Sequence, residues 1–176
     1  MARSFADESA RYIRDVYLPR LTTALQELPS KDLWWQPHAE CISFGIILKH
    51  LEGNVRQWIL CALGSELDRR DRNSEFQSTS TSDGKRLLSA LNATVAQAAV
   101  VLESIGHSQL DQTLHIQGQD MTVKEAIYHV VEHFSWHTGQ AVWIAKARAG
   151  TGHGVAFYDD AKLQRSTEAS EDQRLQ

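Results

Sequence analysis

Only three prolines occur in this chain, all before residue 38, so the rest of the sequence is free to form long helices. Proline breaks a helix interior because its ring removes a backbone N–H and clashes with the preceding turn. Apolar residues recur at three- and four-residue spacing, the pattern of amphipathic helices. The stretches with this pattern lie at about 5–28, 43–63, 83–105 and 122–149. We therefore expect an all-α protein with four long helices.

The boundaries of the first two helices are marked by residues that break or cap a helix. Pro19 lies inside the first helical pattern and predicts a kink or local break there. Pro29 ends that helix, because the residue before a proline disfavours the helical conformation. Ser43 is a candidate N-cap of the second helix, and Gly64 is a candidate C-terminal stop.

The second half of the chain has equally clear signals. The connection at 65–82 is polar, charged and long for a compact domain, which favours a functional or wrapping role. Asp83 is the candidate N-cap of the third helix, and the stretch 114–120 predicts a tight turn or short hairpin. Thr122 is expected to cap the fourth helix, with Glu125 completing a capping box.

Length and composition indicate one globular domain. The chain has 176 residues, of which 42% are hydrophobic. We assign residues 1–154 to the helical domain and the polar residues 155–176 to a C-terminal extension, disordered from about residue 166. The two cysteines, Cys41 and Cys61, form no disulfide framework, and no apolar stretch is long enough to span a bilayer. These features predict a cytoplasmic protein without membrane contact.

The charge balance argues against a nucleic-acid partner. The chain has 18 basic and 22 acidic residues, which gives a net charge of -4, so there is no basic excess to attract phosphate. Arg69, Arg70 and Arg72 are interleaved with Asp68 and Asp71, and this run is interpreted as a solvated loop. We expect no nucleic-acid binding.

Three histidines, His129, His133 and His137, recur at four-residue spacing in the fourth helical stretch. Residues four apart share a helix face, where two imidazoles can bind one metal ion. The alternatives are a solvated face or a set of hydrogen-bonded core histidines. An apolar stripe that includes His137 argues against the solvated face. Its other members are Val130, Phe134, Ala141 and Ile144.

A catalytic zinc site needs three protein ligands and one open position. The fourth helix offers two, His133 and His137, so a third must come from elsewhere. His50 is the best candidate, because it lies beside the apolar stripe of the second helix. The alternative for a single histidine there is an ordinary core or boundary residue with satisfied hydrogen bonds.

Two motifs in these helices resemble a known superfamily. Residues 50–54 read His-Leu-Glu-Gly-Asn, and residues 133–140 read His-Phe-Ser-Trp-His-Thr-Gly-Gln. Their order and spacing resemble the motifs His-Leu-x-x-Asn and His-x-x-x-His-x-Gly-Gln of the DinB-like (YfiT-like) superfamily, and the likeness extends to about residue 147. The resemblance implies an up-down-down-up four-helix bundle that binds one metal ion through His50, His133 and His137. It also implies that His129 is not a ligand.

One residue departs from the superfamily pattern and makes the chain similar to a particular subgroup. Thr138 stands where many members have arginine. This substitution, together with the charged run at 70–76, is similar to an uncharacterised bacterial subgroup of the superfamily. It weakens any transfer of activity from the better-known thiol transferases.

The chemistry that such a site implies is acidification of a bound water or thiol. Three neutral imidazoles leave the ion its full charge, so a hydroxide or thiolate can form near neutral pH. We expect one divalent ion, zinc first and nickel as a substitute. The resemblance implies a thiol S-transferase or small hydrolase acting on a small-molecule thiol and an electrophile. The alternative is a non-catalytic metal-binding protein for stress response or interaction.

Three polar residues near the expected ligands are candidates to support them: Asn54, His129 and Gln140. Gln140 shares a face with His137, and Asn54 lies one turn after His50. No carboxylate is expected beside the histidines, because Glu132 lies about 100° around the helix from His133.

Large side chains off the core face of the fourth helix predict a homodimer. Trp136, Val142 and Trp143 point partly away from the apolar stripe, which suggests a second buried surface. The alternative is that residues 65–82 or 155–158 cover them within one chain.

Overall fold

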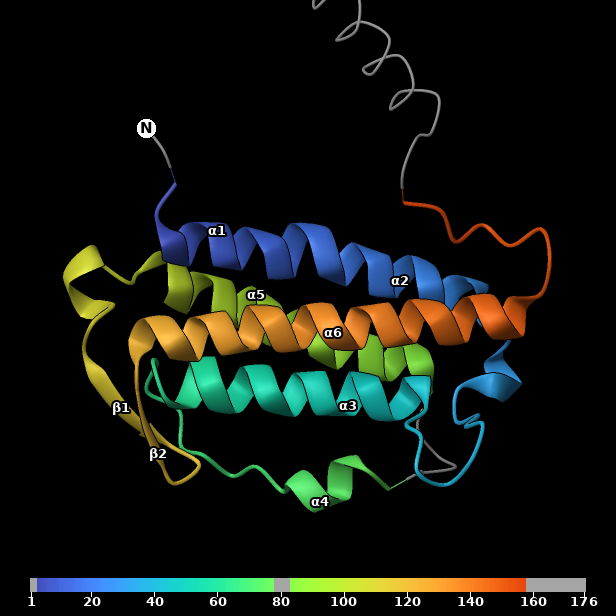
Figure 1. Cartoon of the computed structure of the whole chain (residues 1–176), viewed down its shortest axis with the longest axis horizontal. Helices are drawn as coiled ribbons and strands as arrows, with labels where there is room; N and C mark the ends of the chain where they lie inside the picture. The colour runs from blue at the N-terminus through green and yellow to red at the C-terminus, as the bar shows by residue number, and fades with distance from the viewer. Residues whose placement is uncertain (1–2, 78–82, 158–176) are drawn as a thin grey trace, which may run out of the picture.

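The computed structural model describes residues 3–77 and 83–157, and these are mostly helical. The chain forms four long helical segments that lie side by side (Figure 1). The first comprises α1 (Phe5–Arg11), η1 (Tyr12–Tyr17) and α2 (Leu18–Glu27), and the second comprises α3 (Phe44–Val55) and η3 (Arg56–Cys61). The third is α5 (Gly84–Glu103) and the fourth is α6 (Val123–Ala149). The all-α expectation is therefore confirmed.

Short elements connect these segments. Two 3-10 turns, η2 (Ser30–Asp32) and η4 (His107–Gln109), follow the first and third segments, and α4 (Arg72–Glu75) lies in the long connection before α5. The strands β1 (Thr113–Ile116) and β2 (Gln119–Thr122) pair antiparallel as the expected hairpin before α6. Figure 1 shows α4 and the hairpin on the same side of α3.

The expected caps are present. The Ser43 hydroxyl accepts the Ile46 N–H at 3.3 Å, and the Asp83 carboxylate accepts the Lys85 N–H at 3.1 Å. Thr122 and Glu125 form both bonds of the capping box. Each cap satisfies an N–H that the start of a helix leaves without a partner.

Two π-helical turns interrupt the first two segments. The turn η1 precedes Pro19, and at its C-terminal end the Leu18 N–H bonds to the Ile13 carbonyl, five residues back. The helix continues through Pro19, and the local change in the hydrogen-bond pattern lies in the turn just before it. The similar turn η3 in the second segment was not expected from the sequence.

A single core joins the helices. Segment α3 packs against α5 and α6, α2 packs against α6, and α1 packs against α5. Fully buried side chains come from every segment, among them Leu21, Leu51, Leu91 and Phe134. The chain returns to this core after α6, because Val155 is buried and Phe157 packs against it. The expected disorder from about residue 166 lies outside the described residues.

Candidate metal centre

The structure brings His50, His133 and His137 together. His50 lies on α3 and the other two lie one turn apart on α6, against which α3 packs. The Nε2 atoms of His50 and His133 are 3.0 Å apart, and one ligand atom from each of the three rings lies within 4.8 Å of the others. Tetrahedral zinc with Zn–N bonds of about 2.0–2.1 Å has nitrogens roughly 3.3 Å apart, so one ion would fit if the Nε2 atoms of His50 and His133 moved slightly apart and any wider gap in the group closed.

The surroundings keep the imidazoles of His133 and His137 neutral. Burial, and then repulsion from His137 and His50, lowers the pKa of His133 to about 3. Burial and the neighbouring His50 lower the pKa of His137 to about 4. Both rings therefore present free lone pairs at physiological pH, which is the form that binds metal.

Hydrogen bonds on the outer nitrogens orient two of the rings. Glu75 Oε2 lies 2.8 Å from His50 Nδ1, and Gln140 Oε1 lies 2.7 Å from His137 Nδ1. With each Nδ1–H donated outward, the Nε2 lone pair is directed toward the other histidines. A carboxylate or carbonyl behind a histidine is the usual support of a metal ligand.

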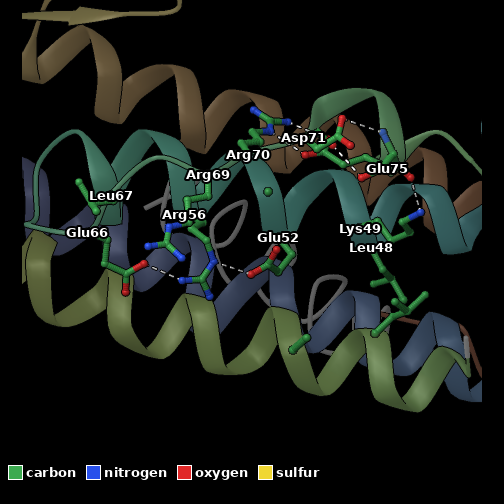
Figure 2. Close-up of a pocket in the computed structure, with 14 residues that line it drawn as sticks. Leu48, Lys49, Glu52, Arg56, Glu66, Leu67, Arg69, Arg70, Asp71 and Glu75 are labelled. Atoms are coloured by element: carbon green, nitrogen blue, oxygen red, sulfur yellow. Dashed lines mark hydrogen bonds and ion pairs between the residues drawn. The ribbon is translucent and has the colours of Figure 1, made fainter.

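Arg70 holds Glu75 in place. The positions of both residues differ from what the sequence predicted, which was a solvated Arg70 and no carboxylate beside the histidines. The Arg70 guanidinium donates to Glu75 through Nε at 2.6 Å and Nη2 at 2.9 Å, and the Arg70 side chain is only 6% exposed. Arg70 is thus not part of a solvated loop, and a carboxylate does stand beside the histidines. Figure 2 shows the two residues together beside α3, where they also line a cavity of about 600 Å³. Hydrogen bonds from Arg70 and His50 outweigh the effect of burial and lower the pKa of Glu75.

The sequence contained only an indirect signal for the pairing of Arg70 with Glu75. The long charged connection suggested a functional loop, and Lys49 anchors it to α3 by donating to the Ser74 and Gln77 carbonyls. Gly53 supplies the room for Glu75, since a Cβ there would overlap Glu75 Oε1 and lie 3.1 Å from Arg70 Nε.

The remaining candidates lie beside the three histidines. The His129 ring packs against Trp58 in a tilted arrangement with ring centroids 4.1 Å apart, and its centroid is 5.5 Å from that of His133. Asn54 is buried, and its Oδ1 finds no hydrogen-bond partner in the described part of the chain. The Nδ1 of His133 is likewise buried and without a partner among residues 3–77 and 83–157.

Alanine at Gly53 is expected to weaken the site. Its methyl group would displace Glu75 and cost about 1–3 kcal/mol of overpacking, with a loss of zinc affinity. Gly139→Ala is the matched control, because a Cβ at this helical glycine meets nothing within 4 Å. It should stabilise the protein by about 0.5–1 kcal/mol and leave zinc affinity unchanged. Thermal denaturation and zinc titration of both variants check this, and unaltered zinc binding in Gly53→Ala would contradict it.

Metal-free protein should lose stability as the pH falls from about 6.5 toward 4. In this range the unfolded chain takes up protons at an ordinary histidine pKa of 6.5, whereas folded His133 and His137 stay neutral. Protons therefore favour the unfolded state, and the free energy of unfolding decreases with decreasing pH. Urea denaturation at several pH values should show a shallower dependence for His133→Asn. An equal slope would refute the lowered pKa.

The fold and the cluster define a helical protein with three convergent histidines that could hold a metal ion. The sequence matches the family described as "Protein of unknown function (DUF1572)" over residues 2–153, and the chain belongs to this family, which is DinB-like. No curated protein matches the chain. Within the described residues, no helix combines the length and apolar character needed to cross a membrane.

Proposed function

We propose that this protein binds one divalent metal ion through the Nε2 atoms of His50, His133 and His137. The observation that carries the proposal is the opposed use of the ring nitrogens. The Nδ1 atoms of His50 and His137 have hydrogen-bond partners on the outside, while the Nε2 atoms of His50 and His133 approach each other inside the cluster. Zinc is the expected ion and nickel its substitute, because imidazole suits both. Glu75 and Gln140 would orient the ligands, and Asn54 Oδ1 is available to accept the His133 Nδ1–H.

We further propose that the four segments form an up-down-down-up bundle of the DinB-like superfamily, in the subgroup suggested by Thr138. The long connection between η3 and α5, with α4 inside it, supports this connectivity, because it is long enough to return the chain to the end where α3 begins. The metal ligands then come from the second and fourth segments, which pack against each other.

The reaction we propose is transfer of a small-molecule thiol to an electrophile, or hydrolysis of a small substrate. A bound divalent ion would supply the positive charge that acidifies a thiol or water. Imidazole ligands add no compensating negative charge. Glu75 holds the proton of His50 Nδ1, and its own charge is offset by Arg70. The alternative is a non-catalytic metal-binding protein whose fourth metal position is closed.

Cobalt substitution separates these functions. Protein loaded with Co²⁺ is titrated with 2-mercaptoethanol, and formation of a sulfur-to-cobalt charge-transfer band in the near ultraviolet is expected for an open site. Protein that binds stoichiometric Co²⁺ but develops no such band has a closed site, which would favour the non-catalytic alternative. The variant His137→Ala serves as the background for non-specific cobalt binding.

We also propose that the protein is a homodimer. Three large aromatic side chains of α6 remain exposed: Tyr128 at 63%, Trp136 at 66% and Trp143 at 58%. Residues 65–77 and 155–157 leave these side chains exposed, which supports a second chain as their cover; residues 78–82 and 158, the rest of the alternative cover, lie outside the described residues. Light scattering at micromolar concentration should give twice the chain mass, and Trp143→Glu should give a monomer. A monomeric wild-type protein would refute the proposal. The cytoplasmic location and the lack of a nucleic-acid partner stay predictions.

A further inference from the structure

Gln57, on η3, contacts both the long connection and the hairpin through its side-chain amide. Its Oε1 accepts from Arg70 Nη1 at 2.9 Å and from Gln117 Nε2 at 2.6 Å. Its Nε2 donates to Asp68 Oδ2 at 2.7 Å, and the other oxygen of Asp68 accepts the Arg70 backbone N–H at 3.0 Å. Both lone pairs of the Gln57 oxygen are therefore used, and Arg70 is held through its guanidinium and its backbone.

Arg70 and Glu75 both lie beside the outer nitrogen of His50. Glu75 Oε2 lies 2.8 Å from His50 Nδ1, and Arg70 Nη2, which donates to the same carboxylate oxygen at 2.9 Å, lies 3.3 Å from that nitrogen. Figure 2 shows Arg70 and Glu75 together. A guanidinium can only donate hydrogen bonds, and an ionised carboxylate can only accept them. Glu75 therefore favours a proton on Nδ1, whereas Arg70 favours a lone pair there.

The choice between these two neighbours determines what His50 presents to the other histidines. A neutral imidazole carries one ring proton, so a proton on Nδ1 leaves a free lone pair on Nε2. This Nε2 is the atom that lies 3.0 Å from His133 Nε2. A proton on Nε2 would prevent it from binding a metal ion. Gln57 holds Arg70 Nη1, and the remaining donors of the guanidinium, Nε and Nη2, are directed at Glu75.

The hairpin turn is matched to Gln57 rather than to its own backbone. Residues 117 and 118 form the two-residue turn between β1 and β2, and both have a positive φ, of 53° and 78°. Turns of this kind favour Asn-Gly, because asparagine adopts a positive φ more readily than most residues. Gln117 is one methylene longer than asparagine, and its amide reaches Gln57 across 60 residues of sequence. The less favourable residue thus makes the contact between the hairpin and η3.

We propose that Gln57 is a positioning residue, which holds the Arg70 guanidinium on Glu75 and thereby keeps the proton of His50 on Nδ1. Gln117 secures Gln57, so the hairpin contributes to the same arrangement. The consequence for zinc affinity rests on the proposed function, whereas the position of the His50 proton does not require a metal ion.

The position of this proton is measured by nuclear magnetic resonance on nitrogen-15-labelled, EDTA-treated protein at mildly alkaline pH. Long-range proton–nitrogen spectra distinguish protonated from unprotonated ring nitrogens, and the averaged shifts give the tautomer populations. The chain has eight histidines, and the His50 signals are identified by their loss in His50→Gln. In wild type the proton should reside on Nδ1. Gln57→Met, which keeps the side-chain length and removes the amide, should move part of it to Nε2.

Zinc affinity should change by the same factor as the tautomer population. Only the tautomer with a free Nε2 binds zinc, so the apparent dissociation constant is the intrinsic value divided by the fraction of that tautomer. If Gln57→Met lowers this fraction to between about one third and one tenth, the constant measured by chelator competition should rise roughly three- to tenfold. Gln117→Asn should have a smaller effect in the same direction without destabilising the turn. An unchanged His50 in Gln117→Asn would overturn the role of the hairpin.

A double variant provides the matched rescue. Gln57→Glu with Asp68→Asn exchanges the amide and the carboxylate, which keeps the acceptor oxygens for Arg70 and Gln117 and leaves the net charge unchanged. It should restore the wild-type tautomer. Glu66→Gln, on the same connection but outside these hydrogen bonds, should not move the proton. A merely structural Gln57 would lower stability without changing the tautomer. The proposal is overturned if the proton stays on Nδ1 in Gln57→Met, if Glu66→Gln moves it equally, or if the double variant fails to restore it.

Two measurements on wild type separate this proposal from the metal centre. The tautomer is measured without metal, and bound zinc is measured independently by elemental analysis. A His50 tautomer that depends on Gln57, in a protein that binds no stoichiometric zinc, would support the positioning role and refute the metal centre. Stoichiometric zinc with a tautomer that is independent of Gln57 would refute the positioning role and leave the metal centre standing.

Discussion

Replacing His133 by alanine is expected to abolish stoichiometric zinc binding. His133 is the central ring of the cluster, with its centroid 4.8 Å from that of His50 and 4.5 Å from that of His137. Its loss leaves two ligands on different helices. Loss of a hydrogen-bond partner behind a ligand typically weakens metal binding ~10–100-fold, and loss of the ligand itself should exceed this. Elemental analysis of untagged protein after gel filtration measures the effect, with about one zinc per chain expected for wild type.

His129→Ala is the matched control, because it removes a histidine one turn earlier on the same helix. Its ring packs on Trp58 and does not belong to the three-histidine group. Zinc content should therefore stay near the wild-type value. Full zinc occupancy in His133→Ala would disprove the proposed ligand set, and a loss in both variants would place His129 among the ligands.

The second large effect is expected for Glu75→Gln, which should both destabilise the protein and weaken zinc binding. Glu75 is buried and pairs with Arg70, whose side chain is 6% exposed. Without the carboxylate the buried guanidinium has no countercharge, which costs about 3 kcal/mol in the folded state. The outward bond of His50 Nδ1 also weakens, so zinc affinity should fall by roughly 10–100-fold.

Glu66→Gln provides the comparison on the same connection. Glu66 pairs with Arg56 at 2.7 Å, but both side chains are more than two-fifths exposed, at 44% and 41%. Exposed ion pairs contribute about 0–1 kcal/mol, so this variant should unfold at nearly the wild-type urea concentration and bind zinc normally. Equal effects of the two substitutions would show that the Arg70–Glu75 pair has no special role.

The helices and two of the three clustered histidines could be predicted from the sequence because their signals are local. Apolar periodicity and caps such as Ser43 and Thr122 determine where each helix lies, and the structure contains these caps. The four-residue spacing of His133 and His137 places them on one face, because a helix turns once in 3.6 residues. His50 could be proposed from its place beside the apolar stripe of the second helix and from the family motif, but nothing local in the sequence relates it to α6.

Only the tertiary structure determines which side chains surround the three histidines. Glu75 reaches His50 across 25 residues, and it can do so because α4 packs on α3 where Gly53 has no side chain. The alternating charges around Arg70 predicted a solvated side chain, because charge pattern alone gives no information on packing. The contact of Trp58 with His129 likewise joins two helices. Sequence spacing determines which residues share a helix face, but the path of a connection and the packing of helices determine which side chains meet across them, and these depend on the whole core.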